Sequence, residues 1–84
     1  MVRGESVKAT VDYDLFGVNI RGELGIYLKT DKNTKKSLIY FPVNDEWAEL
    51  TRDQFKRIKE GKVSKKNKDF INRVKEMVIT FPTG

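Results

Sequence analysis

The side chains that could carry out catalysis in this sequence are few, because the chain has no histidine and no cysteine. It therefore lacks the usual general base near neutral pH, a thiol nucleophile and the commonest transition-metal ligands. Two sets of carboxylates remain as candidates: the pair Asp12 and Asp14, and the three neighbouring residues Asp45, Glu46 and Glu49. Such groups act as acid and base only in a pocket that separates their pKa values, and a domain this small rarely encloses one. We expect no enzyme activity, no metal ion and no cofactor.

Basic side chains gather toward the C-terminal end, where they could hold phosphate groups. Residues 61–84 carry six Lys and Arg against two acidic residues, whereas residues 1–60 carry eleven against ten. Clustered lysines neutralise nucleic-acid phosphates, and such binding weakens as salt rises. The first hypothesis is therefore RNA or DNA binding through this segment, with Phe16 or Tyr27 stacking on an unpaired base. The candidate phosphate contacts are Lys56, Arg57, Lys59, Lys62, Lys65, Lys66, Lys68 and Arg73.

The stretch DLFGVNIRG, residues 14–22, supports a second hypothesis. Its glycines indicate a loop, and Leu15, Phe16 and Val18 are apolar residues that look exposed within it. A hydrophobic loop can anchor a protein partner while the basic segment steers toward an acidic surface. The alternative function is thus a protein-interaction module, such as an adaptor, an accessory subunit or a phage-type inhibitor. Phe16 is equally compatible with capping the end of the barrel. A lysine-rich helix is more often simply a solvated surface than a phosphate-binding face.

Short strands are the elements that must position these side chains. Residues 6–13 and 23–30 alternate apolar and polar types with period two, which predicts strands with one buried face, and Gly25 marks a bulge or bend. Residues 31–36 read as a solvated hairpin loop. Residues 38–50 then predict two further strands around a turn at Asn44 and Asp45.

Helical signals follow the last of these strands. Residues 51–54, TRDQ, fit a capping box and predict a short helix over residues 52–60 that ends at Gly61. Residues 65–77 place apolar side chains at helical spacing opposite a basic face, which predicts an amphipathic helix. The β-prone residues 78–81 predict a short edge strand, which can pair within the monomer or across a dimer.

The composition bounds the class of protein. Eighty-four residues make one domain, and 38% apolar with 35% charged residues suffice for a small core. Charges interrupt every apolar run, so no window resembles a signal peptide or a membrane span. We expect a soluble cytoplasmic protein without a membrane partner. Trp47, the one tryptophan, is expected at the core or its edge and not as an exposed stacking platform.

Two stretches resemble the SH3-like barrel of the KOW and translation-protein type. The run VKATVDYDLFGVNIRGELGIYL, residues 7–28, is similar to the opening of such a barrel, where a first strand leads through a loop into a strand with a G-x-x-G pattern, here GELG. The run SLIYFPVNDEWAELTRDQFKRI, residues 37–58, is similar to the usual ending: an aromatic-rich strand, a turn, another strand and a helical turn that closes on a hydrophobic residue.

This resemblance implies a mainly β fold, a small antiparallel barrel over residues 6–60, to which residues 61–84 add the amphipathic helix and the final strand. KOW-type domains bind RNA, ribosomal or RNA-polymerase surfaces through the loops around the first strand pair, which here would involve Phe16, Asn19 and Arg21. Arg21 thereby joins the candidate partner contacts. Other barrels of this kind dock acidic proteins, and the acidic residues entering the loop, Asp12 and Asp14, repel phosphate.

Overall fold

A computed structural model describes residues 2–58 and 72–77 of the chain. This part is mainly β, as the sequence predicts, and every strand pairing in it is antiparallel. Residues 72–77 are helical. The elements of the first segment are β1 (Ser6–Ala9), β2 (Asp14–Leu15), β3 (Val18–Asn19), β4 (Leu24–Thr30), β5 (Lys36–Phe41), β6 (Glu46–Thr51), the 3-10 helix η1 (Arg52–Gln54) and β7 (Phe55–Arg57).

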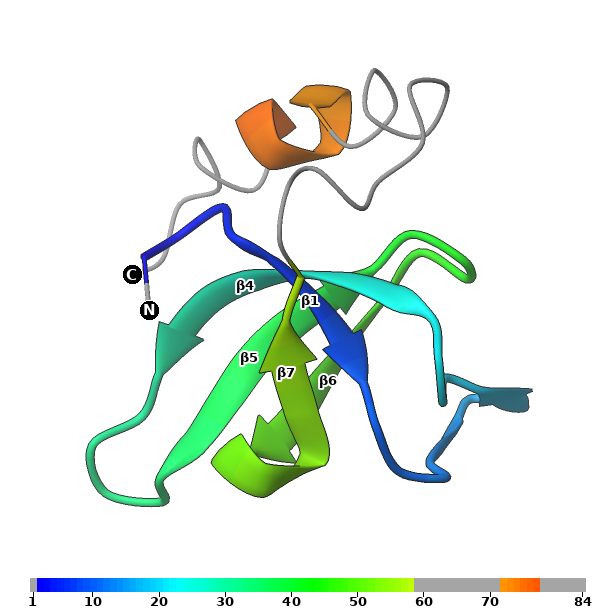
Figure 1. Ribbon diagram of the computed structural model, residues 1–84, viewed down its shortest axis with the longest axis horizontal. Coiled ribbons are helices and arrows are strands. Elements are labelled where there is room, and N and C mark those ends of the chain that lie inside the picture. The colour runs from blue at the N-terminus through cyan, green and yellow to red at the C-terminus, as the bar shows by residue number, and fades with distance from the viewer. Residues whose placement is uncertain (1, 59–71, 78–84) are drawn as a thin grey trace.

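Five strands form one sheet in the order β6-β5-β4-β1-β7, while β2 and β3 form a separate two-stranded hairpin. The first strand lies inside the sheet, because Val7 of β1 faces Gly25 on one side and Arg57 on the other. Figure 1 shows β1 and β7 in front of β5 and β6, with the long strand β4 crossing between the two pairs. The sheet therefore folds over on itself and encloses the side chains of its inner face.

That inner face holds the main hydrophobic core. Alternate residues of each strand point inward, as the pleat of a strand requires. Gly25 lies where β4 passes close to β5, and a Cβ built on it would come within 2.5 Å of Ile39 Cγ2 and 3.0 Å of the Phe41 ring. The bulge expected at Gly25 is instead a register shift between Tyr27 and Lys29. The buried residues of this core are Val7, Ala9, Leu15, Ile20, Tyr27, Ile39, Phe41, Ala48, Leu50 and Phe55.

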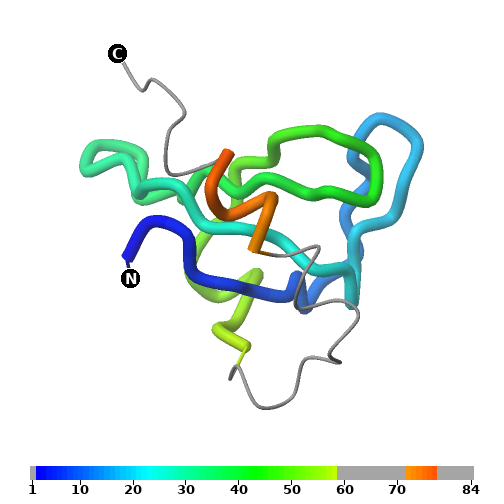
Figure 2. The backbone as a smooth tube through the Cα atoms, turned by 90° about the horizontal axis from the view of Figure 1, so that it is seen from above, coloured from blue at the N-terminus to red at the C-terminus, as the bar shows by residue number. Residues whose placement is uncertain are grey.

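A second apolar cluster lies on the opposite face of β4 and β5. Ile26, Leu28 and Tyr40 pack there with Val74, which comes from the helical residues 72–77 (Figures 1 and 2). Trp47 packs against this cluster half-buried, with its ring centroid 5.2 Å from that of Tyr40 and the two planes tilted by 57°. Its place at the core edge agrees with the prediction. Strand β4 is consequently buried on both of its faces.

The first strand is shorter than predicted, because β1 ends at Ala9 and not at residue 13. Beyond it, the Thr10 amide donates to the Gln54 carbonyl oxygen at 2.9 Å, and the Gly22 amide donates to the Ala9 carbonyl oxygen at 2.8 Å. These bonds direct the chain out of the sheet and toward the β2–β3 hairpin. The alternation of apolar and polar residues continues to residue 13, so the sequence pattern did not show that the strand ends at Ala9.

The helix predicted over residues 52–60 is wrong for the residues that the structure describes. The capping signal is present, since the Gln54 Oε1 accepts a hydrogen bond from the Thr51 amide at 2.8 Å. It starts only the single turn of η1, after which Phe55 enters the core and pairs with Ala9 as the first residue of β7. Burying Phe55 beside β1 outweighs the helical propensity of this segment. The predicted helix end at Gly61, residues 65–71 and the strand at residues 78–81 lie outside the described residues.

Candidate binding surface

The β2–β3 hairpin presents Phe16 at its tip. Leu15 pairs with Val18, so Phe16 and Gly17 form a two-residue turn, and both have positive φ, 49° and 89°. Turns of this form favour Asn, Asp or Gly, because a side chain in the left-handed region crowds its own backbone. Phe16 nevertheless occupies the first turn position, and 77% of its surface is exposed. A large aromatic side chain is thus held in water at an unfavourable backbone conformation.

Leu15 does not share this exposure, so the expectation of three exposed apolar residues in the loop is wrong. Leu15 is 4% exposed and belongs to the main core, and Val18 opposite it is half-buried. Alternation explains the difference, since neighbouring residues of a strand point to opposite sides. Leu15 anchors the hairpin, and the exposed apolar contact of the loop is Phe16.

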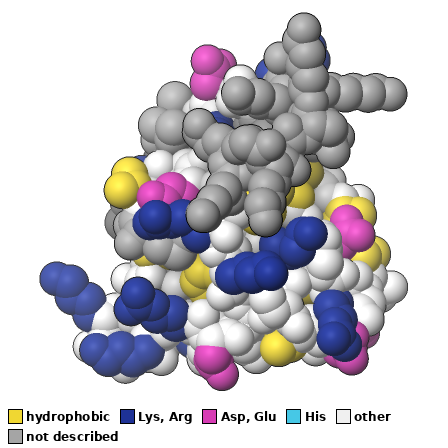
Figure 3. All heavy atoms as spheres, in the orientation of Figure 1, with side chains coloured by type: hydrophobic (Ala, Val, Ile, Leu, Met, Phe, Trp, Pro, Cys, Tyr) yellow, Lys and Arg dark blue, Asp and Glu magenta, His cyan; other side chains and the backbone are white. Residues whose placement is uncertain are grey.

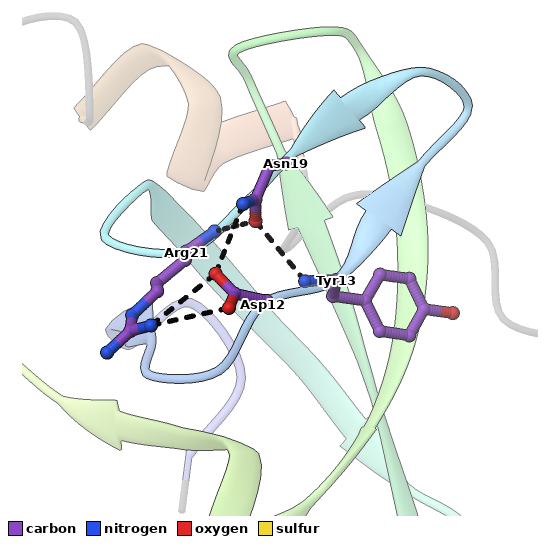
Figure 4. Close-up of polar contacts among 4 residues, drawn as sticks. All are labelled: Asp12, Tyr13, Asn19 and Arg21. Atoms are coloured by element: carbon purple, nitrogen blue, oxygen red, sulfur yellow. Dashed lines mark hydrogen bonds and ion pairs between the residues drawn. The ribbon is translucent and has the colours of Figure 1, made fainter.

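Polar contacts fix the base of the hairpin, as Figure 4 shows. The Asn19 Oδ1 accepts hydrogen bonds from the amides of Tyr13 at 3.2 Å and Arg21 at 3.1 Å, while its Nδ2 donates to the Asp12 Oδ1 at 3.2 Å. Arg21 Nη1 lies 3.4 Å from Asp12 Oδ2. The Asn19 hydrogen bond and then the Arg21 charge hold the pKa of Asp12 below its usual value. Arg21, expected as a partner contact, is therefore engaged with Asp12, while the Tyr13 ring points away.

The turn between β5 and β6 lies beside this hairpin. Asn44 Nδ2 donates a hydrogen bond to the Leu15 carbonyl oxygen at 2.9 Å, and the two turns adjoin at one end of the fold (Figure 2). Val43, the residue before Asn44, is 51% exposed. Phe16 directly follows Leu15 and Val43 directly precedes Asn44, so each apolar residue adjoins one of the two bonded residues. We call Phe16, Val18 and Val43 the two-turn surface.

The β5–β6 turn is itself held in place by a partly buried hydrogen bond. The Tyr40 hydroxyl donates to the carboxylate of Asp45, which has a positive φ of 54°. Burial, followed by the neighbouring Asp45, raises the pKa of Tyr40 to about 12. The Tyr40 hydroxyl therefore stays protonated and keeps donating over the physiological range. This contact fixes the turn that carries Val43.

The predicted phosphate contacts are only partly within the described residues. Lys56, Arg57 and Arg73 are exposed. Lys56 lies directly opposite Lys8 across β7 and β1, whereas Arg57 Nε is 3.0 Å from Glu5 Oε2 and forms an ion pair. The remaining candidates, Lys59, Lys62, Lys65, Lys66 and Lys68, lie outside the described residues.

A further basic group surrounds the loop between β4 and β5. Figure 3 shows Lys and Arg side chains gathered over this loop, and the exposed cations there are Lys29, Lys32, Lys35 and Lys36. Asp31 is the acid among them, and its Oδ1 accepts hydrogen bonds from the Asn33 and Thr34 amides, which lower its pKa. A pocket of about 240 Å³ lies beside this loop. The prediction of a solvated loop over residues 31–36 did not include it. Only the fold brings its lining together from three strands, the β4–β5 loop and η1, so no local motif could have indicated it.

Two of the carboxylates considered for catalysis make contacts that hold turns and the hairpin base in place. Asp12 bonds Asn19 and Arg21, and Asp45 accepts from Tyr40. Across residues 2–58 and 72–77, no group of three His, Cys, Asp or Glu side chains is placed to hold a metal ion. Within the same residues, no helix is long and apolar enough to cross a membrane. Comparison with known protein families, curated proteins and solved structures finds no match to this chain.

Proposed function

We propose that this chain is a non-enzymatic binding module that docks a protein partner through the two-turn surface. The observation that carries the proposal is Phe16, a 77% exposed aromatic residue with a φ of 49°. Conformational strain at an exposed position persists where the residue has a use that offsets its cost in stability. Burying one Phe side chain against a partner contributes on the order of 1.5–3 kcal/mol.

The surroundings of Phe16 suit an anchor residue. Leu15 is buried beneath it, Asn19 and Arg21 tie the base of the hairpin to Asp12, and Asn44 ties its rim to the next turn. A side chain on such a fixed support loses little further freedom on binding, which favours affinity. Val43 extends the apolar contact on the neighbouring turn. The net charge of +5 favours an acidic partner, mainly by raising the rate of encounter.

The proposal includes the SH3-like barrel fold. Supporting it are the central position of β1 between β4 and β7, the hairpin inserted between β1 and β4, and the single turn of η1 that closes on Phe55. In this proposal β7 completes the barrel, and an amphipathic helix over residues 65–77 and a final strand over residues 78–81 are added to it. The one domain is soluble and cytoplasmic.

Affinity capture followed by direct titration tests the proposed function. The wild-type chain, Phe16→Asn and Val43→Thr serve as baits. Val2→Thr is the matched control, because Val2 is likewise an exposed valine and is not part of the two-turn surface. Each captured protein is then purified and titrated against the same four chains. We expect a partner that Val2→Thr keeps and Phe16→Asn loses by at least about tenfold in Kd, the loss of one buried anchor. A partner bound equally by Phe16→Asn would contradict the proposal.

Nucleic-acid binding is a second candidate, which one observation favours. Lys8 and Lys56 lie directly opposite each other on β1 and β7, an arrangement of like charges that costs stability unless an anion lies between them. The test is a titration with labelled single-stranded RNA, single-stranded DNA and duplex DNA at two salt concentrations. We expect binding that falls steeply with salt and weakens in Lys56→Glu and in the triple Lys65, Lys66 and Lys68 reversal to Glu. Absence of binding at low salt would remove this candidate.

A further inference from the structure

The β4–β5 loop lies at the end of the fold away from the β2–β3 hairpin (Figures 1 and 2). A pocket of about 240 Å³ is lined in part by this loop. That volume is well above the roughly 10–15 Å³ needed to hold one water molecule, so the pocket has room for a small ligand. Its lining comes from β4, the loop, β5, η1 and β7: Tyr27, Thr30, Lys35, Ser37, Arg52 and Phe55. These residues contribute two cations, three hydroxyl groups and two aromatic rings to the pocket. None of them is acidic, so the lining contains no carboxylate.

The hydroxyl groups form a chain with one proton to spare. Tyr27 OH lies 2.5 Å from Thr30 Oγ1, which lies 2.8 Å from Ser37 Oγ. Three hydroxyls carry three protons, and their two mutual hydrogen bonds use two of them. When the chain runs head to tail, one end, Tyr27 or Ser37, keeps a proton to donate elsewhere, and when both ends donate to Thr30, the Thr30 hydroxyl keeps it. In the head-to-tail arrangement the hydroxyls polarise one another, so the remaining donor is strengthened.

The positive charges of the pocket are set in place by the backbone. Lys35 has a φ of 62°, and its amide donates to the Asp31 carbonyl oxygen at 2.9 Å, which closes the loop. Arg52 is brought alongside because Thr51, the residue before it, pairs with Lys36. Among residues 2–58 and 72–77, neither Lys35 nor Arg52 forms an ion pair, and the pocket lining contains no carboxylate. These two side chains therefore leave positive charge in the pocket that an added anion would balance.

The aromatic part of the lining limits the ligand further. Phe55 and Tyr27 are largely buried, and they supply an apolar wall beneath the two cations. A phosphomonoester carries about 1.5–2 negative charges at neutral pH, which matches two cations and one hydroxyl donor better than a singly charged carboxylate does. We propose that this pocket binds a small phosphomonoester with a ring as its body, the phosphate beside Lys35 and Arg52 and the ring against Phe55. The shared chemistry is that of a nucleoside monophosphate or an aryl phosphate.

Backbone-amide NMR titration of the full chain tests this site, with phenyl phosphate as the probe at low salt. We expect shifts at Lys35, Ser37 and Arg52, and a Kd weakened by about tenfold in Lys35→Gln and in Arg52→Gln, the loss of one charge-assisted contact. Lys32→Gln is the matched control, because Lys32 lies in the same loop but does not line the pocket. Ser37→Ala, which keeps the packing, should weaken binding by about threefold or more, the loss of a neutral hydrogen bond.

Three results would overturn the proposal: no shifts at these amides, an equal loss in Lys32→Gln and Lys35→Gln, or inorganic phosphate binding as tightly as phenyl phosphate. Adenosine monophosphate and phosphotyrosine are titrated in parallel, and the tighter of the two identifies the body of the ligand. Phe16→Asn should bind phenyl phosphate like the wild type. The pocket and the proposed protein-docking function can therefore fail independently.

Discussion

Asn44 and Leu15 are joined by a hydrogen bond of 2.9 Å from the Asn44 Nδ2 to the Leu15 carbonyl oxygen, across 29 residues of sequence. Leu15 is the core anchor of the β2–β3 hairpin, and Asn44 lies in the turn between β5 and β6. The bond thus sets the position of Phe16 relative to Val43. The other end of the Asn44 amide, Oδ1, is buried without a hydrogen-bond partner among the described residues, so the amide is held by Nδ2.

Replacing Asn44 with Ala should loosen the hairpin more than the rest of the fold. The Leu15 carbonyl oxygen loses its donor, and we expect a loss of about 1 kcal/mol in the free energy of unfolding. Amide exchange over residues 14–19 should accelerate beyond that of β4 and β5. Asn33→Ala, a change of the same type in the β4–β5 loop, serves as the control. Unchanged exchange in the hairpin would show that the Asn44 bond does not hold it.

Replacing Phe16 with Asn should stabilise the protein while removing its proposed function. Asn tolerates the left-handed conformation that Phe16 adopts with a φ of 49°, so we expect a gain of about 0.5–1 kcal/mol in urea unfolding. Phe16→Ala keeps the backbone strain and gives the comparison. Equal or lower stability of the Asn variant would mean that Phe16 makes contacts in the folded chain that offset its conformation.

Replacing Gly25 with Ala should destabilise the fold by overpacking. The new methyl group would lie 2.5 Å from Ile39 Cγ2, inside the main core, and we expect a cost of about 1–3 kcal/mol in urea unfolding. Ile39→Ala removes the atom that the methyl group meets. In a double-mutant cycle the Gly25 substitution should therefore cost less in the Ile39→Ala background, with a coupling of at least about 0.5 kcal/mol. Strict additivity would place the strain elsewhere.

Acidification should weaken the base of the hairpin through Asp12. The pKa of Asp12 is lowered in the folded chain from 3.8, first by Asn19 and then by Arg21, so its carboxylate contributes stability above that value. This contribution is lost as pH falls through the folded-state pKa, because the unfolded chain then binds more protons. NMR should show the Asn19 and Arg21 signals shifting at acid pH together with Asp12. Asp12→Asn should remove these coupled shifts, whereas Asp53→Asn should keep them.

The sequence allows the strands to be predicted well where both local pattern and pairing agree. Period two located β4, and the turn residues Asn44 and Asp45 separated β5 from β6. It failed where tertiary packing overrides a local signal. The capping box before Arg52 is real, yet Phe55 has a better place in the core beside Ala9 than on a helix.

The candidate surfaces show the same division. Phe16 was recognisable because an apolar residue beside Gly17 signals a turn, but its neighbour Leu15 was misplaced, since the sequence does not say which side of a two-residue strand faces inward. Val43 is held near Phe16 only by the hydrogen bond from Asn44 to Leu15, two residues that lie 29 positions apart in the sequence. The pocket lining, assembled from Tyr27 to Phe55, has no local sequence signature at all.

The burial of β4 on both faces affects how this protein behaves when it is cut or partly unfolded. Val74 covers Ile26, Leu28 and Tyr40 on the outside of the sheet, while the inner core is complete without it. Cleavage after residue 58 would therefore leave a β-rich fragment with a bare apolar stripe. Such a stripe favours aggregation in water. We therefore expect proteolysis between the two described segments to make the remaining β-rich fragment prone to aggregation.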